Sequence, residues 1–111
     1  MQIEQQEIII RLMHVNLKGR LDANSVLALK DLWRTYDEHG QHNILLDLHQ
    51  VDFIDSIGIS TLVNGLKQCR AKGGDLRLIG LQPSARAVFE LMMLDRVFEI
   101  FETREEALKG F

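Results

Sequence analysis

The chain has one cysteine and one proline among 111 residues, and only 6% of its residues are aromatic. A lone cysteine forms no intramolecular disulfide, so the fold must depend on a hydrophobic core, as is usual in a reducing compartment. Cys69 falls on an apolar helical stripe, which indicates a small buried side chain rather than a nucleophile. We therefore expect a cytoplasmic protein without a disulfide framework.

Long hydrophobic runs and clusters of basic residues are also missing. No apolar stretch approaches the ~20 residues that a membrane-spanning helix needs. Residues 1–7 lack the basic and apolar regions of a signal peptide. The 13 Lys and Arg residues are scattered and outnumbered by 16 Asp and Glu, which argues against a nucleic-acid surface. We expect neither a nucleic-acid partner nor direct membrane insertion.

What is present is the composition of one globular domain. The chain is 46% hydrophobic and 26% charged, which is ordinary for such a domain. Its length suits a single hydrophobic core. No repeat, low-complexity tract or linker divides it, so we expect one domain spanning residues 1–111.

The first part of the chain predicts a β-hairpin and then a helix. Residues 3–17 alternate between apolar and polar over a length that suits two strands, although no turn residue lies near Arg11. The spacing then changes to the three- and four-residue steps of a helix, at Val26, Leu29, Leu32, Trp33 and Tyr36. Asn24 or Ser25 can cap this helix at its start, and Gly40 can end it.

The remaining chain alternates strands with helices. Strands are predicted at residues 44–48, 76–79 and 97–101, and the first of these is apolar enough to be buried on both faces. A helix with the apolar face Ile59, Leu62, Val63, Leu66 and Cys69 is expected to end at residues 73–74. Pro83 suits the first turn of a third helix, and Thr103 with Glu106 forms a capping box for a fourth.

The order β-β-α-β-α-β-α-β-α predicts the fold class. Strand–helix–strand units favour parallel pairing with right-handed crossovers. We therefore expect an α/β fold with a mixed sheet of four to five strands and about four helices packed against it. In the third helix the expected apolar face is Val88, Phe89 and Met92. Residues 92–94 are expected in the core or at its edge, and the alternative is a partly exposed methionine pair that adds to a partner surface.

The stretch from Val51 to Gly58 joins a buried strand to an amphipathic helix, with Asp55 and Ser56 at the junction. Backbone N–H groups at a helix start are unpaired and partly positive, so the simpler interpretation is a helix cap. The alternative is a modification site. A serine hydroxyl held there can accept a phosphate of about -1.5 to -2 charge, which the helix start tolerates and an acidic partner does not.

Three segments together resemble the STAS domain of anti-sigma factor antagonists: Gly19–Asp22, Ile44–Leu48 and Val51–Gly58. Later segments also follow that family's order, at residues 73–76, 83–85 and 94–98. The resemblance covers essentially the whole chain and implies a single STAS domain. It also implies a function in signal transduction to transcription, with no cofactor.

In that family, the serine after the motif aspartate is phosphorylated by a partner that is both anti-sigma factor and serine kinase. The resemblance therefore implies that Ser56 is the phosphorylation site. The unphosphorylated antagonist binds and sequesters the anti-sigma factor, phosphorylation releases it, and a PP2C-type phosphatase resets the switch.

The resemblance also implies a set of partner-binding residues around Ser56. Asp22 is expected near the phosphorylation loop, and Asp55 is expected to help hold that loop. Gly58 is expected to let backbone and partner approach closely. Ile57 departs from the small residue that is usual in the family. Its branched side chain is expected to alter the fit of the partner or slow phosphorylation.

Two functions of other classes stay open. A non-catalytic STAS adaptor in a membrane lipid-transport or other signalling complex would use the same surface without a phosphate. An enzyme using Ser56 would need a base, and His49 has no evident partner to orient it, so we expect no catalysis. His39 and His42 lack the further ligands of a zinc site, and no nucleophile elbow or P-loop is present.

Overall fold

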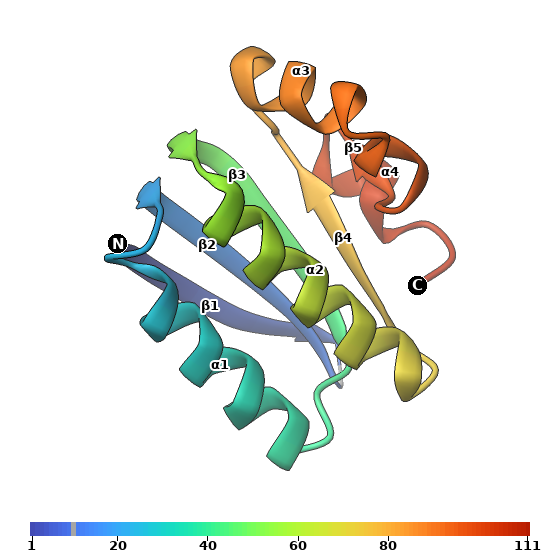
Figure 1. The fold of residues 1–111 in the computed structure, drawn as a ribbon. Coiled ribbons are helices and arrows are strands. Elements are labelled where there is room, and N and C mark those ends of the chain that lie inside the picture. Colours follow the sequence, from blue (N-terminus) through green and yellow to red (C-terminus); the bar gives the residue numbers. More distant parts are fainter. Residues whose placement is uncertain (10) are drawn as a thin grey trace.

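The structure is a computed structural model that describes residues 1–9 and 11–111. Its strands are β1 (Gln2–Ile9), β2 (Leu12–Leu21), β3 (Asn43–Ile54), β4 (Asp75–Ile79) and β5 (Ile100–Phe101). Its helices are α1 (Val26–Glu38), α2 (Ser56–Ala71), α3 (Pro83–Leu91) and α4 (Arg104–Leu108), with a 3-10 turn, η1, at Leu94–Arg96. This is the predicted order of elements (Figure 1).

All five strands form one mixed sheet in the order β1-β2-β3-β4-β5. β1 and β2 form the predicted antiparallel hairpin, and the other neighbouring pairs are parallel. The hairpin connection includes residue 10, which lies outside the described residues. Arg11 beside it has a φ of 65°, so a non-glycine residue adopts the left-handed conformation. Because an arginine takes the conformation that glycine or asparagine usually adopts in a turn, the sequence carried no turn signal here.

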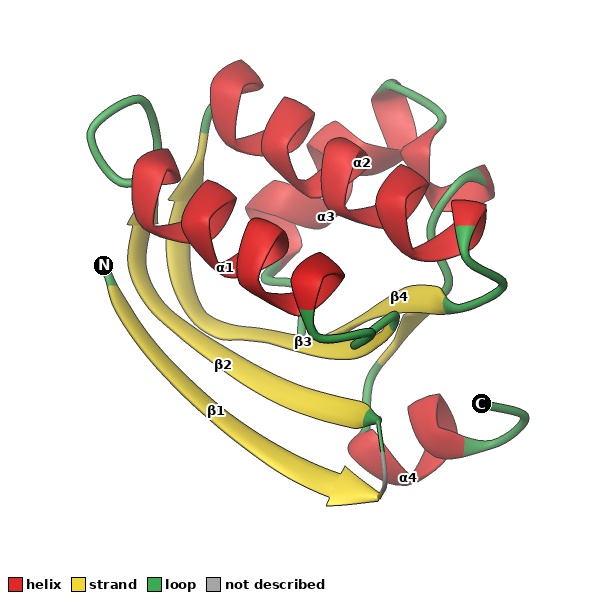
Figure 2. Ribbon diagram, turned by 90° about the horizontal axis from the view of Figure 1, so that it is seen from below, coloured by secondary structure: helices red, strands yellow, loops and turns green. Residues whose placement is uncertain are grey.

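The sheet separates two hydrophobic clusters, because its strands turn alternate side chains to opposite faces. Helices α1, α2 and α3 cover one face, and α4 covers the other face at the β4–β5 end (Figure 2). The larger cluster lies under the three helices, and the smaller one lies under α4 and consists of Leu45, Ile79 and Ala107. Leu45 and Leu46 are both 0% exposed, which confirms that β3 is buried on both faces. The predicted α/β class with a mixed sheet is confirmed.

Most predicted helix ends are confirmed. Gly40 follows α1 with a φ of 69°, and the N–H of Gln41 donates to the carbonyl of Tyr36 at 2.8 Å, which closes the helix. Pro83 is the first residue of α3, and the Thr103 hydroxyl accepts the N–H of Glu106 at the start of α4. The proposed cap of α1 by Asn24 or Ser25 is wrong, because no side chain caps this helix.

Two predictions near the C-terminal side are also wrong. The strand expected at residues 97–101 covers only Ile100–Phe101, because η1 continues into a hydrogen bond from the Phe98 N–H to the Leu94 carbonyl. That turn points the Phe98 ring inward, 5.7 Å from the ring of Phe89. In α3 only Phe89 is buried, because the helix lies at the margin of the sheet.

The exposed side of α3 corrects the prediction for residues 92–94. Met92 is 51% exposed and Met93 is 59% exposed, so neither belongs to the core, whereas Leu94 packs against it. Val88 is 40% exposed. The apolar face predicted for this helix is therefore largely a surface.

Arg77 on β4 holds the segment that contains α4. Its guanidinium donates to the carbonyl oxygens of Ala107 at 2.8 Å and Lys109 at 2.7 Å, and it lies 4.2 Å from the centre of the Phe111 ring. Charge-assisted hydrogen bonds of this kind are stronger than neutral ones. A helix of five residues is thereby fixed against the outer face of the sheet.

Cys69 is 0% exposed, and burial raises the pKa of its thiol to about 12. The prediction of a small core residue rather than a nucleophile is confirmed. In the described residues, no helix is both long and apolar enough to cross a membrane.

Candidate functional site

The ends of β2 and β3 lie side by side at one edge of the sheet. Leu21 pairs with Ile54, and the N–H of Asp55 donates to the carbonyl of Leu21 at 3.2 Å. Both strands run past the ends predicted for them, and their last residues pair with each other. The sequence segments 19–22 and 51–58 are therefore neighbours in space (Figure 1).

Asp55 is the N-cap of α2. Its backbone is extended, with a φ of -96°, and its carboxylate accepts the N–H of Gly58 at 2.8 Å. This hydrogen bond satisfies one of the unpaired N–H groups at the helix start. The cap interpretation of Asp55 is confirmed.

Replacing Asp55 with alanine is expected to lower the free energy of unfolding by about 1 kcal/mol, because one N–H of α2 loses its acceptor. Asp55→Asn should retain most of the stability, since an amide oxygen caps nearly as well. Urea denaturation followed by circular dichroism measures both. The exposed Asp52→Ala serves as control, and an Asp55→Ala midpoint equal to that of Asp52→Ala would contradict the assignment.

Ser56 is the first residue of α2 and is exposed. Its carbonyl accepts the hydroxyl of Ser60 at 3.0 Å. Among the described residues its own hydroxyl has no hydrogen-bond partner, because Asp55 provides the cap. The hydroxyl is therefore presented to solvent beside the positive end of a 16-residue helix.

Two exposed apolar residues lie within three positions of Ser56 in the chain, and only Ile57 was among the predicted site residues. Ile57 is 44% exposed and Phe53 is 39% exposed. The guanidinium of Arg20 lies 4.0 Å above the Phe53 ring. A hollow of about 170 Å³ separates the end of β3 from the start of α3 and is lined by Asp52, Phe53, Ile54, Ser84, Ala85 and Val88. Phe53 was not predicted as a site residue, although an aromatic residue beside the polar Asp52 near the end of a strand could have indicated it.

Gly58 is buried, and the predicted close approach of backbone at this position is confirmed within the chain. Its contact with a partner stays a prediction. A Cβ atom on this residue would lie 2.4 Å from the Leu21 carbonyl oxygen and 2.9 Å from Leu21 Cγ. The close approach that requires glycine is therefore between α2 and the end of β2 in the same chain. By letting the start of α2 pack directly against Leu21, Gly58 fixes the positions of Ser56 and Ile57.

Asp22 organises the loop after β2. Its carboxylate accepts the N–H of Asn24 at 3.0 Å and the Nε–H of Arg20 at 3.3 Å. Desolvation acts to raise the pKa of Asp22, but the Asn24 hydrogen bond and the Arg20 guanidinium outweigh it and hold the pKa below its ordinary value. The Ser25 hydroxyl donates to the Arg20 carbonyl at 2.7 Å and closes the same loop. Asp22 thus stays ionised beside the loop that carries Ser56.

His49 has a carboxylate partner, which corrects the prediction that nothing orients it. Its Nδ1 lies 2.6 Å from the Asp47 carboxylate. Among the described residues no hydrogen bond connects His49 with Ser56, so the pair forms no nucleophile and base. His42 lies 3.9 Å from Asp37, and no cluster of three metal-ligating side chains occurs in residues 1–9 and 11–111.

Comparison with known proteins gives a family match and a similar bacterial protein. The family model described as "STAS domain" matches residues 1–107. A protein of Bordetella bronchiseptica named "Putative anti-sigma factor antagonist BtrV" is 34% identical over 95 residues, which is 86% of this chain and 82% of the relative.

Solved structures show the same fold. The crystal structure of a Thermotoga maritima protein, described as a "putative anti-sigma factor antagonist", has a TM-score of 0.89 at 26% identity, covering 96% of this chain and 92% of that one. The anti-sigma factor antagonist SpoIIAA in its unphosphorylated form has a TM-score of 0.79 at 19% identity, covering 99% of this chain and all of the other. At that identity the second likeness concerns the fold alone.

Proposed function

Because this chain belongs to the STAS domain family, we propose that it is an anti-sigma factor antagonist whose switch residue is Ser56. In its unphosphorylated form it binds and sequesters an anti-sigma factor that is also a serine kinase, which frees a sigma factor for transcription. Phosphorylation of Ser56 ends this complex, and a PP2C-type phosphatase restores it. In this role the protein acts in the cytoplasm and catalyses no reaction itself.

The observation that carries this proposal is the position of the Ser56 hydroxyl. It stands exposed at the first turn of α2, and the cap is already provided by Asp55. A phosphate there gains the favourable field of the helix start, so phosphorylation leaves the fold intact. The switch then acts on the surface and not by unfolding the domain.

The surface around Ser56 explains why a phosphate would break the complex. Ile57 follows Ser56 in the chain, and Phe53 and Val88 line the hollow between β3 and α3; all three side chains are exposed. We infer that an anti-sigma factor covers these side chains and Ser56 together with Asp22 and Asp55. A phosphate in such a contact must lose its hydration without gaining a partner, which is costly. The names of the relatives favour this role over that of a membrane-complex adaptor.

Mass spectrometry of the native protein from cells tests the proposal. We expect one phosphate on Ser56 in part of the population, with a larger fraction when the phosphatase is deleted. Ser60 is a matched internal control, because it is an exposed serine one turn later on the same helix. An unphosphorylated Ser56 in the phosphatase-deleted strain, or a phosphate on Ser60 instead, would overturn it.

A further inference from the structure

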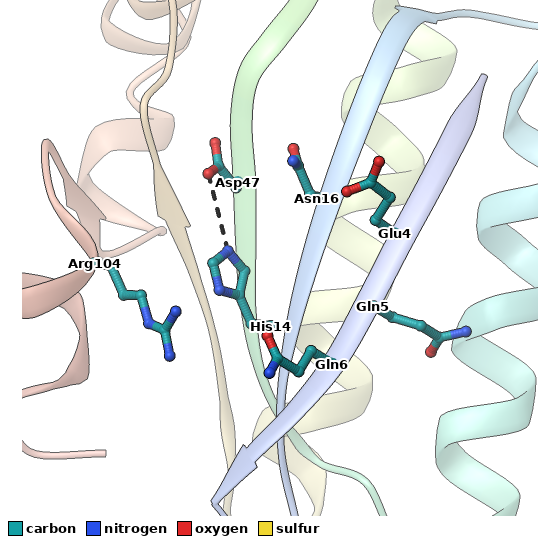
Figure 3. Close-up of a pocket in the computed structure, with 7 residues that line it drawn as sticks. All are labelled: Glu4, Gln5, Gln6, His14, Asn16, Asp47 and Arg104. Carbon is teal, nitrogen blue, oxygen red and sulfur yellow. Dashed lines mark ion pairs between the residues drawn. The ribbon is translucent and has the colours of Figure 1, made fainter.

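The sheet has a polar face on the side opposite α1 and α2, and α4 covers only the β4–β5 end of it (Figure 2). This face carries a cavity of about 410 Å³, which is in the range of small-molecule sites. Its lining is Glu4, Gln5, Gln6, His14, Asn16, Asp47 and Arg104 (Figure 3). Helix α2, with Ser56, lies on the other face of the sheet.

Strand alternation explains why this cavity is polar. On β2, Met13 and Val15 face the larger hydrophobic cluster, so His14 and Asn16 face the opposite way. Asp47 does the same on β3, and Glu4 on β1.

Two opposite charges border the cavity without neutralising each other. Glu4 lies on β1, and Arg104 lies at the start of α4 on the far side of β2 and β3 (Figure 3). Within residues 1–9 and 11–111, neither side chain takes part in an ion pair. A ligand that meets both must itself carry charges of both signs.

Between these charges, the floor of the cavity offers unused hydrogen-bond acceptors. The Oδ1 atom of Asn16 is buried and has no partner among the described residues. The Oδ1 atom of Asp47 already accepts the N–H of His49 at 2.9 Å and lies 2.6 Å from His49 Nδ1. Its Oδ2 atom lies 3.9 Å from His14 Nε2, which is too far for a good hydrogen bond. Buried acceptors without partners are rare in folded proteins and call for a donor.

His14 leaves the Oδ2 atom of Asp47 available to a ligand. Burial lowers the pKa of His14, and the nearby Arg104 lowers it further, against the opposing effect of Asp47. The imidazole is therefore neutral at pH 7. The charged groups that face it are Asp47 from β3 and Arg104 from α4.

We propose that this cavity binds a small zwitterion of the α-amino-acid class. Its carboxylate pairs with the guanidinium of Arg104, which can donate two parallel hydrogen bonds to it. Its ammonium group lies toward Glu4 and donates to Asn16 Oδ1 and to the Asp47 carboxylate. Neither an anion alone nor a cation alone satisfies both ends of the cavity.

Titration by NMR, with the imidazole signals of His14 observed in the full chain, tests this assignment. The signal is identified by its loss in His14→Gln. Glycine and L-glutamine are added as probes, with acetate and methylammonium as molecules that carry only one of the two charges. We expect saturable shifts with the amino acids and binding of each single-charge molecule weaker by about tenfold or more. No saturable shift with either amino acid, or acetate binding as tightly as glycine, would overturn the proposal.

Two substitutions locate the ligand. Arg104→Gln should weaken amino-acid binding about tenfold, because it removes the charge that pairs with the carboxylate. The matched control is Arg34→Gln on α1, which removes an exposed arginine away from the cavity and should leave binding unchanged. Arg104→Gln protein that is folded by circular dichroism and binds like Arg34→Gln would contradict the site. Ser56→Ala should bind normally, so the outcome is independent of the phosphorylation switch.

Discussion

Ser56→Asp protein is expected to bind the anti-sigma factor about a hundredfold more weakly than the unsubstituted protein. A carboxylate at this position would be buried among Ile57, Phe53 and Val88 in the proposed complex, where no partner charge awaits it. An uncompensated buried charge costs roughly 3 kcal/mol, which corresponds to a factor of about one hundred. Isothermal titration calorimetry with the purified anti-sigma factor measures the change.

Two further variants separate a specific switch from a general effect of charge. Ser56→Ala should bind like the unsubstituted protein and resist phosphorylation by the partner. Ser60→Asp adds the same charge one turn along α2 and should weaken binding far less. Thermal unfolding of Ser56→Asp should be unchanged or slightly improved, because an acidic group at a helix start is favourable. Binding of Ser56→Asp as tight as that of Ser56→Ala would refute the switch.

Gly58→Ala should destabilise the protein by about 3 kcal/mol, at the upper end of what overpacking usually costs. The added methyl group would lie 2.4 Å from the Leu21 carbonyl oxygen, and that oxygen cannot turn away without losing the hydrogen bond from Asp55. The helix start and the end of β2 must therefore move apart. Urea denaturation followed by circular dichroism gives the free energy of unfolding.

The matched control for Gly58→Ala is Asn64→Ala, which changes an exposed residue of the same helix. Its effect should stay within roughly 0.5 kcal/mol. If both variants unfold at the same urea concentration, Gly58 is not required for packing. If Gly58→Ala is destabilised but still folded, it should also bind the anti-sigma factor poorly, because Ser56 and Ile57 move with the start of α2.

The order of elements was predictable because burial on one face imposes a period on the sequence. The hydrophobic steps from Val26 to Tyr36 and the apolar run at residues 44–48 are direct consequences of the core they form. Local signals were equally reliable where a single residue determines the backbone conformation. Examples are Gly40 after α1 and Pro83 at the start of α3. Each of these depends on neighbours in the chain.

Predictions failed where distant segments decide the conformation. Leu21 and Ile54 extend their strands because they pair with each other, and neither carries a local strand signal. Phe98 is buried against Phe89 by a turn, whereas alternation suggested a strand. In the third helix, Val88 and Met92 have the spacing of a buried face, but the sheet does not extend beneath them.

In the candidate site, too, features set by neighbouring residues were predictable and features set by distant contacts were not. The placement of Asp55 and Ser56 at a helix start followed from the spacing of the residues after them, and the structure confirms it. The burial of Gly58 and the contact between Arg20 and Phe53 depend on the meeting of β2 with β3. These contacts join residues more than thirty positions apart, so no local sequence pattern predicts them.

The hydrogen bond between Asp55 and Leu21 makes the proposed partner surface a discontinuous epitope. A synthetic peptide of residues 50–60 contains the whole motif but neither the carbonyl that anchors it nor the Arg20 side chain beside Phe53. During synthesis, Ser56 acquires its surroundings only when β2 and β3 have paired. A kinase that reads this surface therefore recognises the completed domain and ignores nascent or unfolded copies of the same sequence.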